Sequence, residues 1–165
     1  MIRNRCIFVL FICAVFFVIG GAAHSAGKSP LLPAFAERSR VPASGKQGPP
    51  GAAAGLIGNW KKGEILFARH CQACHGPRGT DKVANPDSSD GTVPPLNPID
   101  PDLADKKPST FAEKIDRYIQ HGSMPDGSQP VLFMPDWGDS KGLSQTEIAS
   151  VEAYILRLNG VKRTK

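Results

Sequence analysis

The chain has 165 residues and a formal net charge of +5, a length that favours a single domain. The positive charge lies at the two ends, because residues 56–160 carry 11 basic and 14 acidic side chains, a net charge of −3. A nucleic-acid-binding protein would present a basic face on its folded part. The charge distribution therefore excludes that class.

Residues 1–26 have the layout of a secretory signal peptide. Two arginines come first, an apolar run of 14 residues follows over residues 6–19, and small residues end the segment. The uncharged stretch continues to Ala23, which makes an uncleaved membrane anchor the alternative. In both cases we expect the rest of the chain to be exported, either periplasmic or anchored on the extracytoplasmic side of the membrane.

Residues 27–55 are rich in Pro, Gly, Ala and Ser and hold few large apolar side chains. This composition predicts a linker. The folded domain is expected over residues 56–160, and a basic tail follows over residues 161–165.

A first helix is predicted from the N-cap Asn59 toward Cys71. Seven prolines between residues 77 and 108 exclude a helix from the next stretch. An irregular segment of this length inside a compact domain usually wraps a ligand or is disordered.

Two more helices are predicted downstream. The middle one should begin at Ser109 or Thr110, because Thr110-x-x-Glu113 matches a capping box, and should end at Gly122. The last one has a second capping box, Ser144-x-x-Glu147. Three short helices bury too little apolar surface for so much loop, so a large apolar cofactor would complete the core.

The pattern Cys71-x-x-Cys74-His75 is the attachment motif of a c-type haem. Cysteines at positions i and i+3 project from one helix face. They can bond the two vinyl groups on one haem edge, and the next residue, His75, then supplies an axial imidazole. We therefore predict one covalently bound haem c.

Other uses of the two thiols fit the sequence less well. A thioredoxin-type dithiol needs a βαβ context, which the helical pattern does not provide. A zinc site needs further ligands and usually a second close cysteine pair. A disulfide closing a loop of one turn would constrain almost nothing.

These features resemble the class I c-type cytochromes over most of residues 56–160. Besides the attachment motif, Gly63-x-x-x-Phe67, Tyr154 and Met134-Pro135 carry the resemblance. It implies a small all-α domain of about three to four helices, with long loops around one haem. In this family a small residue admits a large one where the first and last helices cross, and the haem edge is exposed.

The resemblance places the distal iron ligand at Met134. Its thioether is a soft ligand that raises the potential. Met124-Pro125 offers the same dipeptide nearer the middle helix, so Met124 is the alternative. His121, His70 and an open sixth position also remain.

Two supporting roles complete the predicted site. The N–H of His75 should bond a carbonyl, and the family pattern suggests Pro86 as the acceptor. Trp137 is either a donor to a haem propionate or a half-buried core aromatic.

The expected function is one-electron transfer, with both axial positions filled and no small-molecule substrate. Partners would be transient redox donors and acceptors. Alternatives are a fixed haem c subunit of a membrane-bound oxidoreductase complex, or an open-haem enzyme or gas sensor. The identity of the redox partners and the potential do not follow from the sequence.

Overall fold

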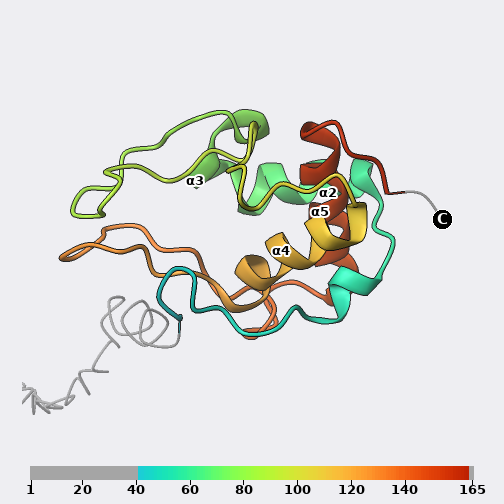
Figure 1. Cartoon of the computed structure of the whole chain (residues 1–165), viewed down its shortest axis with the longest axis horizontal. Coiled ribbons are helices and arrows are strands. Elements are labelled where there is room, and N and C mark those ends of the chain that lie inside the picture. Colours follow the sequence, from blue (N-terminus) through green and yellow to red (C-terminus); the bar gives the residue numbers. More distant parts are fainter. Residues whose placement is uncertain (1–40, 164–165) are drawn as a thin grey trace, which may run out of the picture.

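A computed structural model of the chain describes residues 41–163 (Figure 1). Its elements are, in order, η1 (Ala52–Gly55), α2 (Trp60–His70), α3 (Gln72–His75), η2 (Pro77–Gly79), α4 (Pro108–His121) and α5 (Gln145–Leu158). Residues 41–163 contain isolated β-bridges but no strand. The predicted all-α fold class is therefore confirmed.

The predicted export segment, residues 1–26, lies outside the described residues. Within the part of the chain that the structure describes, no helix has the length and apolar character needed to cross a membrane.

Helix α2 begins at Asn59, as predicted. The Asn59 side chain accepts hydrogen bonds from the backbone N–H groups of Lys61 and Lys62, at 3.0 and 3.2 Å. These bonds satisfy two of the donors that a helix N-terminus leaves unpaired.

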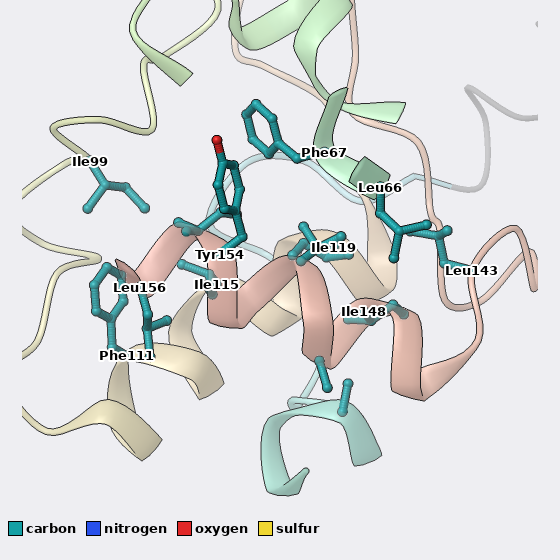
Figure 2. Packing of buried hydrophobic residues seen from close by; sticks show 14 residues of the cluster. Leu66, Phe67, Ile99, Phe111, Ile115, Ile119, Leu143, Ile148, Tyr154 and Leu156 are labelled. Atoms are coloured by element: carbon teal, nitrogen blue, oxygen red, sulfur yellow. The ribbon is translucent and has the colours of Figure 1, made fainter. Parts of the chain in front are cut away.

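Helices α2 and α5 cross at Gly63. A Cβ atom at Gly63 would collide with the backbone carbonyl oxygen of Ser150. One turn further along α2, the rings of Phe67 and Tyr154 pack with centroids 5.4 Å apart (Figure 2). The absence of a side chain at Gly63 thus allows the two helices to approach to backbone contact.

Helix α4 begins earlier than predicted. Its first residue is Pro108 and its N-cap is Lys107, which makes no side-chain capping bond. Proline favours the first helical position because its φ is preset and it has no N–H to leave unpaired. Thr110 therefore lies inside the first turn rather than at the predicted cap. The capping box of Ser144 and Glu147 at the start of α5 is confirmed.

The hydrophobic core lies where α5 packs against α2, α4 and η1. Figure 2 shows Ile115 and Ile119 of α4 facing the side of α5 that carries Ile148. Phe111, Ile148 and Leu156 are fully buried. Ile99, from the proline-rich loop, extends this core.

Residues 41–51, which we call the N-terminal strap, pack on the domain. The main chain of Ala43 pairs with Met124, and the amide of Gln47 donates to the Gly122 carbonyl at 3.3 Å. The N–H of Gly51 donates to the Asp116 carboxylate in α4. Figure 1 shows the strap running along α4 toward η1.

The structure thus differs from the predicted linker over residues 41–55. The segment is poor in large apolar residues, but its backbone groups find partners in α4, α5 and the following loop. The small side chains of Ala53 and Ala54 are buried without needing a wide gap in the core. Residues 27–40 of the predicted linker lie outside the described residues.

Two long loops, residues 80–107 and 122–143, extend from the same side of the helices (Figure 1). Each is folded back on itself by a β-bridge, Ala84 with Thr92 in the first loop and Ser123 with Met134 in the second.

We predict that Gly63→Ala destabilises the protein by about 1–3 kcal/mol, because the new methyl group meets backbone that cannot rotate away. Urea denaturation of the purified protein measures the loss. Gly55→Ala is the matched control, since a Cβ atom there has no neighbour within 4 Å. Equal stability of the two variants would contradict the close crossing.

A second prediction concerns the buried carboxyls of Asp116 and Glu152, which are 0% and 1% exposed. Burial, reinforced by Asp116 and partly opposed by Arg163, raises the pKa of Glu152 from 4.5 to about 10. Between these values the folded state holds a proton that the unfolded state has lost, so stability falls as the pH rises.

Glu152→Gln removes this titration and keeps the side chain's shape. We expect the variant to be more stable than the wild type at about pH 9 and to lose less stability between about pH 6 and pH 9. Denaturant titrations at the two pH values test this. Glu113→Gln, on the exposed face of α4, is the control. An unchanged pH slope in Glu152→Gln would exclude Glu152 as the titrating group.

Candidate functional site

The two cysteines and His75 lie in one turn of chain between α2 and η2. Cys71 caps the C-terminus of α2, and its carbonyl oxygen accepts from the N–H groups of Cys74 and His75 at 3.1 and 3.0 Å. Both cysteines are free thiols and neither is fully exposed. The helical turn therefore presents two thiols and an imidazole within five residues, as the spacing predicts.

Cys71 is an apolar, protonated thiol rather than a reactive thiolate. Its side chain packs against the hydrophobic core. Burial, together with the neighbouring Cys74, raises the pKa of Cys71 to about 12. Redox-active dithiols instead have a cysteine whose pKa is lowered. The environment of Cys71 therefore argues against a thioredoxin-type function.

The imidazole of His75 is held by a backbone carbonyl. Its Nδ1 donates to the Pro94 carbonyl oxygen at 2.9 Å. Burial lowers the pKa of His75, with the Pro94 hydrogen bond opposing, so the ring is neutral at physiological pH. A neutral imidazole that donates through Nδ1 has its free lone pair on Nε2. This is the protonation and orientation that a metal-binding histidine needs.

The acceptor is the Pro94 carbonyl and not the predicted Pro86 carbonyl. The reason is that residues 83–93, which we call the excursion, form a loop whose two ends pair with each other. The Val93 N–H donates to the Val83 carbonyl at 2.7 Å, which brings the chain back to the attachment turn just before Pro94. Pro86 lies in the excursion, and its carbonyl accepts from Val131 of the other long loop at 3.2 Å.

Asn159, which the sequence analysis did not single out, fixes the chain that follows Pro94. Its side-chain amide donates to the Leu96 carbonyl at 2.9 Å and accepts from the Ile99 N–H at 3.0 Å. Asn159 caps the C-terminus of α5. The last helix thus anchors the proline-rich loop, a contact between residues more than 55 positions apart that no local pattern reveals.

The two candidate distal methionines have different surroundings. Met134 packs against the hydrophobic core, and its backbone exchanges two hydrogen bonds with Ser123, at 2.9 and 3.0 Å. Met124 lies along the N-terminal strap, where its N–H donates to the Pro42 carbonyl at 2.7 Å. The core-facing position of Met134 favours it over Met124 as the residue that contacts an apolar cofactor.

Both ring nitrogens of His121 form hydrogen bonds. Nδ1 lies 2.8 Å from an Asp139 carboxylate oxygen, and Nε2 lies 2.9 Å from the Pro49 carbonyl oxygen. Burial alone would lower the pKa of His121, but these two acceptors and the nearby carboxylates raise it. An imidazolium that donates twice has no lone pair for a metal. His121 thus joins the strap to the second loop and does not suit a distal ligand.

Trp137 has the surroundings of a core aromatic, the second of its two predicted roles. It packs against the hydrophobic core, and its ring meets that of His70 edge-on at 5.2 Å between centroids. Across residues 41–163, no group of three or more His, Cys, Asp or Glu side chains is arranged to hold a metal ion.

The family model described as "Cytochrome C oxidase, cbb3-type, subunit III" matches residues 58–155. The matched range runs from the start of α2 into the last turn of α5 and includes both cysteines, His75 and Met134. No curated protein and no solved structure matched the chain. A cytochrome c domain of this kind transfers electrons by means of a haem. The chain therefore belongs to the cbb3-type cytochrome c oxidase subunit III family, a family of class I c-type cytochromes.

Proposed function

We propose that this protein is a one-electron carrier with a single haem c, attached through Cys71 and Cys74 and ligated by His75 and Met134. The observation that carries the proposal is the hydrogen bond from His75 Nδ1 to Pro94, in the same turn as two free thiols. It leaves a neutral imidazole with Nε2 available beside the attachment cysteines.

The residues present fit a haem in three respects. The thiols are one helical turn apart and unbridged. The imidazole has the required protonation. Cys71, Leu96 and Met134 are partly buried apolar residues that pack against the core, so a hydrophobic cofactor in contact with them would extend that core.

A bound haem would supply an iron that gains and loses one electron. The protein's own residues would set its properties. The Pro94 carbonyl holds the His75 ring in one orientation and makes Nε2 a stronger donor. The Met134 thioether, as a soft ligand, favours the reduced iron and raises the potential. With His75 and Met134 both holding the iron, no position would remain for a substrate, so we infer no catalytic reaction.

The charge of the folded part supports transient docking. Residues 56–160 carry a net −3. An acidic carrier associates fastest with a partner that presents a basic patch. We infer an exported location, periplasmic or anchored at the outer face of the membrane, because residues 1–26 have the pattern of an export segment.

The family description supports a second candidate, a fixed haem c subunit of a membrane-bound oxidase. The site would be the same, but the protein would stay with one complex. Co-purification with other oxidase subunits after detergent extraction would distinguish the subunit from a carrier, whether that carrier is soluble or anchored.

The attachment is tested by expressing the full chain with a haem-maturation system. We expect the intact mass to include one haem, and the band on a denaturing gel to stain for covalent haem. The double variant Cys71→Ser/Cys74→Ser should lose both signals, whereas His70→Gln, one residue before the motif, should keep them. Colourless wild-type protein in which Cys71 and Cys74 both react with a thiol reagent after denaturation would refute the proposal.

The distal ligand is tested by Met134→Ala against its matched control, Met124→Ala. Loss of a sulfur ligand should abolish the weak near-infrared band of the oxidised protein and lower the midpoint potential. We expect both effects in Met134→Ala and neither in Met124→Ala. The reverse result would assign the ligand to Met124, and absence of the band from the wild type would exclude methionine ligation.

A further inference from the structure

Asn85 is a buried polar residue in a largely exposed excursion. Only 1% of it is exposed, although it stands between Ala84 and Pro86, both of which are exposed. A side-chain amide is buried at this level only when hydrogen bonds compensate for lost water.

Both polar ends of the Asn85 amide bind one residue of the second loop. The Leu132 N–H donates to Oδ1 at 2.7 Å, and Nδ2 donates to the Leu132 carbonyl oxygen at 3.0 Å. The side chain thus bonds the N–H and the carbonyl of Leu132, as the backbone of a neighbouring β-strand would. We call this pair of bonds the Asn85 clamp.

The clamp lies two residues before Met134. The second loop is held at its base by the backbone pairing of Ser123 with Met134. Further out, Ser89 and Pro86 add backbone bonds to Asp126 and Val131, at 2.7 and 3.2 Å. The Asn85 clamp is therefore a side-chain link between the two loops, two residues from Met134.

The other end of the clamp leads to His75. Asn85 belongs to the excursion that closes between Val83 and Val93, and the next residue, Pro94, accepts from His75. The clamp accordingly joins the loop that orients the proximal imidazole to the loop that carries Met134.

We infer that Asn85 is a positioning residue that keeps Met134 in place as the distal ligand. This inference rests on the proposed function. Breaking the clamp would leave two backbone groups of Leu132 without their partners, which destabilises the clamped position of the loop. That loss would favour states in which the loop has moved and Met134 has left the iron.

Carbon monoxide binding to the reduced holoprotein measures how often the sixth position opens. We expect Asn85→Ala to bind carbon monoxide about tenfold faster than the wild type or more, since about 1.4 kcal/mol corresponds to tenfold. Asn85→Asp keeps the acceptor for the Leu132 N–H but loses the donor to its carbonyl, so its rate should lie between the two.

Gln145→Ala is the matched control. It also removes two hydrogen bonds of a side-chain amide, but those to the Ala53 N–H in η1 and to the Gln120 side chain in α4. It should lower thermal stability as Asn85→Ala does, yet leave the carbon monoxide rate within about twofold of the wild type. An equal acceleration in both variants would indicate general loosening and overturn a specific role for Asn85.

The outcomes separate the inference from the proposed function. Rapid carbon monoxide binding by the wild type would refute distal methionine ligation, and the inference with it. A slow wild type, a fast Met134→Ala and a slow Asn85→Ala would refute the role of Asn85 alone.

If neither Asn85 variant accumulates as holoprotein, amide hydrogen exchange in the wild type decides. A protected Leu132 N–H that opens at the rate at which carbon monoxide enters supports the clamp. Opening slower than carbon monoxide entry, or exchange at the rate of an exposed amide, overturns it.

Discussion

The close crossing of α2 and α5 at Gly63 is the constraint on which the rest of the structure depends. Backbone contact with Ser150 leaves no space for a side chain, so the relative position of the two helices is fixed at that point. The attachment turn follows α2 directly, with Cys71 as its C-cap, and Asn159 caps α5. The crossing therefore sets where the two thiols lie relative to the loop that Asn159 holds.

The helices and the loops are stabilised by different interactions. The helices are held by buried apolar side chains such as Phe67, Phe111 and Ile148. The loops are held mainly by hydrogen bonds between backbone groups, to which a few side-chain amides add, because their residues are largely exposed. Asn85 and Asn159 each satisfy one backbone N–H and one carbonyl in this way. The charged hydrogen bonds of His121 serve the same purpose for the N-terminal strap.

The sequence predicts most accurately those features that depend on interactions between residues close together in the chain. The Asn59 cap, the Ser144 and Glu147 capping box and the turn of the attachment motif each depend on residues within four positions of one another, and the structure contains all of them. The predicted cap at Thr110 is wrong although it also depends on nearby residues, because Pro108, two residues earlier, is itself a favourable first helical residue.

The remaining differences depend on how the loops close. Pro86 and Pro94 are equivalent in local chemistry, and only the pairing of Val83 with Val93 decides which carbonyl reaches His75. Residues 41–55 looked like a linker because composition reports apolar content, whereas their packing depends on backbone hydrogen bonds to α4 and α5. Asn85 and Asn159 gave no signal, since an asparagine in a loop is ordinarily a turn residue.

This division between helices and loops has a functional consequence. Helix packing fixes the attachment turn, so defects in the core should reduce the amount of folded protein. The loops fix the orientation of His75 through Pro94 and the position of Met134 through Ser123 and Asn85. Because these supports are hydrogen bonds outside the main core, a substitution there can alter the ligand environment while the helices stay folded. An electron carrier gains from such an arrangement, since the contacts around His75 and Met134 can change while the helices stay folded.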